Sequence, residues 1–159
     1  EDMLGRKSRP EEKHVKLIPD SPPQVKILFP NQDIVLNQNL LLPLILSADD
    51  DFGLANLVLA YQVNNNKTGS LVIQSVIKGK LFNTDYLWDM KNLELFPGDI
   101  VTYWAEIFDN APSPQKAVST KYRARFPSIE EIYAEIESQE KIKKNELTSA
   151  LDDTQKITG

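Results

Sequence analysis

Short segments in which apolar and polar residues alternate follow one another through most of this chain, and turn residues separate them. Pro22 and Pro23 exclude a helix at the first segment, after which Val25, Ile27 and Phe29 fall on one face of an extended chain. The same period of two recurs in the segments 40–48, 57–63, 71–77, 86–90, 100–108 and 118–126. About seven strands with no helical pattern between them predict a mainly β fold, an antiparallel β-sandwich over residues 22–127.

The alternation also predicts which side chains face the core. Trp88 shares its face with Met90, and Trp104 has the opposite parity to Tyr103, so one of the last two faces outward. Pro43 interrupts the second segment and cannot donate a ladder hydrogen bond, which predicts an edge or a bulge there and a strand half exposed on its hydrogen-bonding side. Aromatic side chains that lay together on the surface could instead form a platform for a glycan.

Residues 128–159 follow a different pattern, which predicts an α-helix. Ser128 and Glu131 fit a capping box at its start. One apolar stripe follows, formed by Ile129, Ile132, Tyr133 and Ile136. Beyond Glu137 the stripe weakens, so we expect the start of a longer coiled or helical region that a partner stabilises. The stripe is a candidate interaction face for the sandwich edge, another protein or a second copy of the chain.

Residues 1–21 are expected to be either a linker or the last strand of a preceding module. Asp2 is followed by a polar turn and an alternating pair of apolar residues, an order that loosely matches the region after Asp109. The match suggests tandem sandwiches, and we expect the chain to be a piece of a larger protein. An orphan N-terminal strand could be exchanged between two copies, which is a second route to a homodimer besides the helix.

The composition argues against several classes of function. The 159 residues include 18 basic and 23 acidic side chains, a net charge of −5 that does not favour nucleic-acid binding. There is no cysteine, and the one histidine, His14, lies in a charged segment, so thiolate and His-rich metal sites are excluded. No phosphate-binding loop or nucleophile elbow occurs. We expect no enzyme activity, and membrane attachment only through other parts of the parent protein.

Several ordered motifs resemble a bacterial immunoglobulin-like module. Residues 47–54 (SADDDFGL) resemble the turn between its second and third strands, and residues 95–104 (LFPGDIVTYW) resemble its proline corner. Residues 125–133 (RFPSIEEIY) are similar to a junction that leads into a long coiled region in large bacterial envelope proteins. The resemblance implies an immunoglobulin-like, fibronectin type III-like β-sandwich outside the cytoplasmic membrane, in the periplasm or at the cell surface.

Acidic residues gather in loops that the sandwich topology brings to one end. The loops 49–53 and 109–115 emerge at the same end, near the point where the chain reaches the first strand. Six side chains could converge there: Asp20, Asp49, Asp50, Asp51, Asp109 and Asn110. Oxygen ligands in this number suit Ca²⁺, and residues 109–112 (DNAP) resemble part of the cadherin calcium linker motif. The alternative is that these side chains cap their own turns.

The function we expect is that of a non-catalytic spacer or interaction module in a larger bacterial envelope protein. Its partners would be other proteins or neighbouring modules of the same chain. The alternative is an adhesion-type ligand-binding module, with Ca²⁺ at the acidic loops or a glycan on exposed aromatic side chains.

Overall fold

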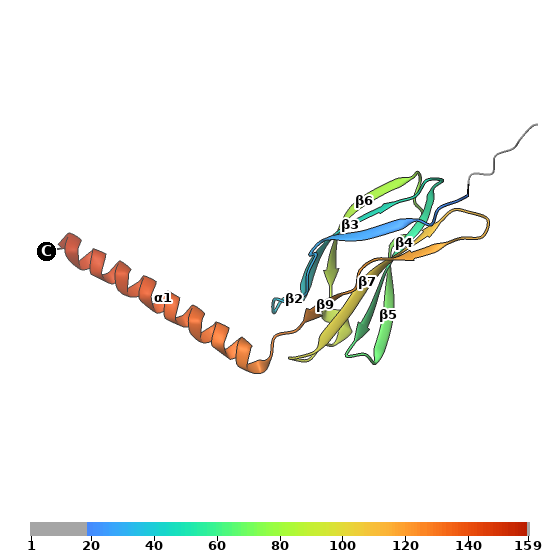
Figure 1. Cartoon of the computed structure of the whole chain (residues 1–159). Coiled ribbons are helices and arrows are strands. Elements are labelled where there is room, and N and C mark those ends of the chain that lie inside the picture. The colour runs from blue at the N-terminus through green and yellow to red at the C-terminus, as the bar shows by residue number, and fades with distance from the viewer. Residues whose placement is uncertain (1–18, 159) are drawn as a thin grey trace, which may run out of the picture.

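The computed structural model describes residues 19–158, with side chains described as far as Asp152, so the strand considered for residues 1–18 lies outside the described part. Two β-sheets pack face to face and one long helix follows them (Figure 1), which confirms the predicted mainly β sandwich. One sheet has the strand order β1-β3-β6, and the other has the order β2-β9-β7-β4-β5, with β8 paired to β7. The elements are β1 (Gln24–Phe29), β2 (Ile34–Val35), β3 (Leu41–Asp49), β4 (Leu54–Val63), β5 (Lys67–Gln74), β6 (Leu81–Asp89), a 3₁₀ turn (Lys91–Leu93), β7 (Ile100–Asp109), β8 (Lys116–Val118), β9 (Tyr122–Arg125) and α1 (Ile129–Thr158).

The described residues form nine strands rather than about seven, and the difference lies in two short elements. The segment 118–126 contains the end of β8 and all of β9, because the chain leaves the ladder at Ser119. The Ala105 N–H donates a hydrogen bond to the Ser119 hydroxyl at 2.8 Å. A side-chain oxygen thus replaces the carbonyl oxygen of a neighbouring strand as its acceptor. β2 pairs in parallel with β9. It contains only Ile34 and Val35 and is therefore too short to produce an alternating pattern in the sequence.

The core lies between the two sheets and is built from the alternating side chains. Trp88 is 2 % exposed and Tyr103 is fully buried, and their rings meet edge to face with centroids 5.9 Å apart. Trp104 lies on the opposite face of β7, where its Nε1 donates to Glu106 Oε1 at 3.0 Å. The predicted parity of the two tryptophans is therefore correct. The rest of the core includes Val25, Ile27, Leu42, Leu44, Leu46, Leu57, Leu59, Met90, Val101 and Ile107.

The expected exposure of the hydrogen-bonding side at Pro43 is confirmed locally, although β3 as a whole is not an edge strand. β3 is the central strand of its sheet, between β1 and β6. However, β1 pairs with β3 only from Ile45 to Asp49, whereas Pro43 lies opposite Leu87 of β6. Beside Pro43 the strand therefore has a neighbour on one side only, and a residue without an N–H is tolerated there.

Tyr103 buries its hydroxyl in this core, and that oxygen has no hydrogen-bond partner among the described residues. Burial is the main cause that raises the pKa of this phenol well above its usual range. A buried hydroxyl without a partner costs free energy, so Tyr103→Phe should raise the free energy of unfolding by about 1 kcal/mol. Urea denaturation checks this, with Tyr86→Phe as a half-buried control that should change stability by less than about 0.5 kcal/mol. A loss of stability in Tyr103→Phe would show that the hydroxyl is bonded.

α1 begins at the predicted capping box and is held by one more residue. The Ser128 N–H donates to Glu131 Oε2 at 2.9 Å, and the Glu131 N–H donates to Ser128 Oγ at 3.3 Å. Arg125, the last residue of β9, donates to both carboxylate oxygens of Glu131 at 2.8 and 2.9 Å. The Arg125 hydrogen bonds, followed by the Ser128 N–H, lower the pKa of Glu131 to about 2. The capping box is visible in the sequence, whereas the contact with Arg125 is not.

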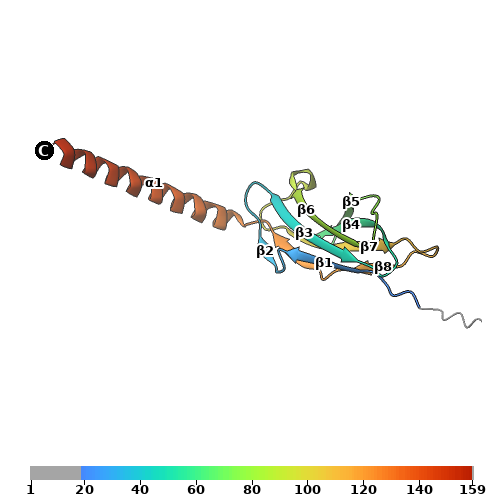
Figure 2. The ribbon, with the colours of Figure 1, turned by 90° about the horizontal axis from the view of Figure 1, so that it is seen from above.

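The helix projects away from the sandwich, so the apolar stripe does not dock on the sandwich edge (Figures 1 and 2). Ile129, Tyr133 and Ile136 are 55 %, 63 % and 40 % exposed, and Ile132 is half-buried. The stripe's role as an interaction face for another protein or another copy stays a prediction. In the part of the chain described here, no helix is both long and apolar enough to cross a membrane.

Candidate metal centre

Three carboxylates meet at the end of the sandwich where the chain enters its first strand. Asp109 is the last residue of β7, and Asp50 directly follows the last residue of β3. The register places Gln24, at the start of β1, opposite Asp49 at the end of β3, so the segment that contains Asp20 reaches the same end. The antiparallel topology thus collects residues that are up to 89 positions apart (109 − 20) in the sequence.

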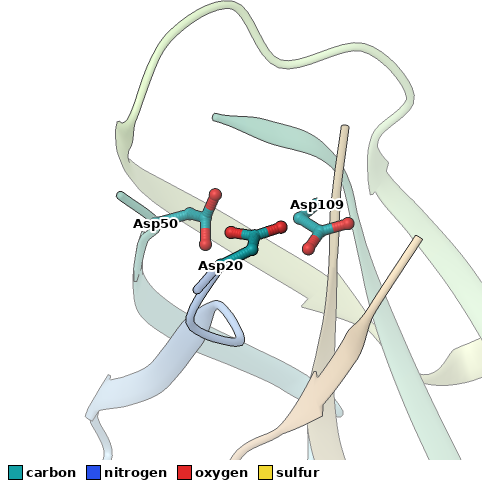
Figure 3. Close-up of side chains that lie close together, drawn as sticks. All are labelled: Asp20, Asp50 and Asp109. Carbon is teal, nitrogen blue, oxygen red and sulfur yellow. The ribbon is translucent and has the colours of Figure 1, made fainter. Parts of the chain in front are cut away.

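The three side chains point toward one another (Figure 3). One carboxylate oxygen from each of Asp20, Asp50 and Asp109 lies within 4.8 Å of the other two. Asp50 is 7 % exposed and Asp109 is 1 % exposed. Each of the three carboxylates has one buried oxygen without a hydrogen-bond partner among the described residues: Oδ1 of Asp20, Oδ1 of Asp50 and Oδ2 of Asp109.

The remaining oxygens of the two buried aspartates organise their own loops. Asp50 Oδ2 accepts from the N–H groups of Phe52 and Gly53 at 3.1 and 2.8 Å. Asp109 Oδ1 accepts from the N–H groups of Ala111 and Gln115 at 3.3 and 2.8 Å. The alternative interpretation as turn capping is therefore correct for one oxygen of each aspartate.

The other residues considered for the site lie at its margin or outside it. Asp51 is close enough to Asp20 to act on its charge, and Asp51 Oδ2 accepts from the Ser21 N–H at 3.4 Å. Asp49 is exposed at the end of β3 and is not in the cluster, because the residue before it on that strand faces the core. The Asn110 side chain instead covers Gly53. The structure therefore brings together three of the six candidates.

The cluster concentrates negative charge. Burial raises the pKa of Asp20, and the charges of Asp51, Asp109 and Asp50 raise it further. Because the charged form is disfavoured in the folded state, this group contributes stability at acidic pH that is lost as the pH rises through its raised pKa. In the described part of the chain, no ion pair joins Asp20, Asp50 or Asp109 to a basic side chain. Such a group of oxygens can bind a cation or share a proton.

Four aromatic side chains form a row of rings within the sandwich. Trp88 and Tyr103 are in the core, and Tyr61 and Tyr122 extend the same row of rings with centroids 5.3 and 6.3 Å from their neighbours. Trp104 is half-buried beneath the Lys121 ammonium, which lies 4.3 Å from the ring centroid. The row therefore stabilises the sandwich and withdraws Trp88 and Tyr103 from the surface, whereas Tyr86, Trp104 and Tyr122 stay partly exposed.

Comparisons with known proteins assign this chain to no family. The chain matches no protein-family model, and a search of curated proteins finds no relative. Among solved structures it is similar to AggA, the major subunit of aggregative adherence fimbriae type I from Escherichia coli. The match has 10 % sequence identity and a TM-score of 0.31, and it covers 68 % of this chain and 94 % of that one. These values do not support a transfer of function.

Proposed function

We propose that this chain is a non-catalytic spacer and interaction module of a larger bacterial envelope protein, on the outer side of the cytoplasmic membrane. One observation carries the proposal: the chain enters and leaves the sandwich at opposite ends (Figure 2). Asp20 and Asp109 mark the first end, and Ile100, at the other end of β7, pairs with Arg125 just before the helix. The ten residues of β7 thus separate the two ends by about 30 Å.

A spacer must also set the direction in which the chain continues. The sandwich does so through the ion pair that joins Arg125 of β9 to Glu131 in the first turn of α1. Glu131 also accepts from the Ser128 N–H, so a single carboxylate holds both the strand end and the helix start. The exposed stripe of Ile129, Ile132, Tyr133 and Ile136 is then presented at a fixed angle to protein partners or to neighbouring helical segments.

The distance between sandwich and helix tests this proposal. The chain has no cysteine, so spin labels can be placed through Ser70→Cys on β5 and Ser138→Cys on α1, both at exposed positions. Pulsed electron paramagnetic resonance at neutral pH should give one narrow distance distribution. Glu131→Gln keeps an acceptor for the cap but loses the ion pair, and it should broaden the distribution.

The matched control is Glu130→Gln, which removes the same charge from the neighbouring exposed residue and should leave the distribution narrow. Because the folded-state pKa of Glu131 is lowered to about 2, the joint should be intact above about pH 5 and should loosen as the pH falls toward 2. A broad distribution in the unsubstituted helix at neutral pH would contradict a spacer with a fixed exit angle.

The proposed partners include a second copy of the chain, through the helix stripe or through exchange of the segment 1–18. Molar mass measured in solution, with and without residues 1–18, separates the two routes. A dimer that survives the deletion is formed through the helix, and one that is lost depends on the N-terminal segment. An adhesion-type module is the second candidate function, and the carboxylate cluster is the observation that favours it.

A further inference from the structure

We propose that Asp20, Asp50 and Asp109 form a Ca²⁺ site that joins the incoming chain to both sheets of the sandwich. A cluster of carboxylates is by itself common on protein surfaces. The second, independent observation that points to a bound cation is the set of buried oxygens without hydrogen-bond partners in the described part of the chain. Asp50 and Asp109 are more than nine-tenths buried, each has one oxygen without a hydrogen-bond partner among the described residues, and both side chains lie close to Asp20 (Figure 3). A buried carboxylate oxygen without a donor costs free energy unless a proton or a cation satisfies it.

Turn capping does not explain these three oxygens. Each cap uses one acceptor atom, Oδ2 of Asp50 or Oδ1 of Asp109, and an asparagine would supply that atom equally well. Aspartate at both positions adds a second oxygen and a negative charge, and both are unfavourable here without a counter-ion. Asp20 caps no turn in the described structure, yet it adds a third carboxylate to the same space.

The spacing of the oxygens fits Ca²⁺. Ca–O distances are about 2.3–2.6 Å, so two ligand oxygens on opposite sides of the ion are at most about 5 Å apart. One oxygen of each of the three carboxylates lies within 4.8 Å of the other two, close to that limit. Mg²⁺ would require the same oxygens to approach to about 2.0–2.1 Å in a regular octahedron, and the absence of cysteine removes thiolate ligands for softer metals. The donor set is therefore hard, anionic and suited to Ca²⁺.

The three ligands come from three parts of the fold. Asp50 follows β3 of the first sheet, Asp109 ends β7 of the second sheet, and Asp20 belongs to the segment that leads into β1. An ion bound to all three would fix the two sheets and the incoming chain at one point, as a counterpart to the Arg125–Glu131 joint at the other end. This inference does not depend on the proposed spacer function.

Thermal unfolding of the 159-residue chain in EDTA and in millimolar Ca²⁺, at matched ionic strength, tests the site. Ca²⁺ at about one hundred times its dissociation constant should raise the melting temperature by about 5–10 °C. Isothermal titration with CaCl₂ should give one ion per chain. Asp109→Asn keeps Oδ1 as the acceptor of the turn-capping hydrogen bonds. It replaces the free Oδ2 by an N–H₂ group, which can donate a hydrogen bond to Asp20. It should therefore melt in EDTA at or above the temperature of the unsubstituted chain, and it should lose the response to Ca²⁺.

Asp49→Asn is the matched control, because it removes the same charge from the same end outside the cluster. It should keep the full Ca²⁺ response, whereas Asp20→Asn should lose it. No change in melting temperature with Ca²⁺ in the unsubstituted chain would overturn the proposal. So would a shift that survives Asp109→Asn, or a larger shift with Mg²⁺ than with Ca²⁺.

Discussion

Replacing Trp88 by alanine should lower the free energy of unfolding by about 3–5 kcal/mol, one of the two largest effects that we expect from a single substitution. Trp88 is 2 % exposed on β6, and its ring packs between Tyr61 and Tyr103, with centroids 5.3 and 5.9 Å away. Alanine removes the indole from the contact between the two sheets, and neighbours on paired strands cannot collapse into the cavity. Urea denaturation followed by circular dichroism measures the loss.

Trp104→Ala is the matched control, because the same atoms are removed from the outer face of the second sheet. There the indole is half-buried and contacts Glu106 and Lys121, so the expected loss is below about 1.5 kcal/mol. A loss in Trp104→Ala equal to that in Trp88→Ala would contradict the assigned faces of β6 and β7. It would also reopen the question of which tryptophan could contact a ligand.

The faces of the strands could be predicted because a period of two leaves a clear record in the sequence. The core position of Trp88 and the opposite faces of Tyr103 and Trp104 follow from their neighbours alone, but the pattern does not say which of the last two faces outward. Details that depend on strand length could not be predicted in this way. Pro43 indicates an edge, yet β3 lies between β1 and β6. The proline is tolerated because the pairing of β1 with β3 stops at Ile45, before it reaches Pro43.

The candidate site was predicted in part for a similar reason. Topology brings the loop after β3, the end of β7 and the chain before β1 to one end, so the meeting of Asp20, Asp50 and Asp109 could be expected. Which oxygen caps a turn and which stays free depends on side-chain rotamers, and no sequence pattern records them. The Arg125–Glu131 joint was missed because its partners lie six residues apart across Pro127, where no helical or strand period applies.

The last large effect concerns Gly53, where the loop between the two sheets contacts the loop after β7. Gly53→Ala should lower the free energy of unfolding by about 2–4 kcal/mol, for two reasons that add. Its φ of +146° is one that side chains with a Cβ rarely adopt. A Cβ there would also lie 2.6 Å from Asn110 Nδ2, so this exposed side chain must turn aside, which adds a smaller cost to that of the backbone.

Two further variants separate these causes in the same urea denaturation experiment. Gly79 has a positive φ of +108°, but a Cβ there would meet no atom within 4 Å, so Gly79→Ala should cost only the backbone term of about 1–2 kcal/mol. Asn110→Ala shortens the side chain that the new methyl group would contact, so adding it to Gly53→Ala should recover up to about 1 kcal/mol. Equal losses in Gly53→Ala and Gly79→Ala, with no recovery in the double variant, would mean that the two loops adjust freely. The acidic end would then lack the rigidity that holds Asp50 and Asp109 in place.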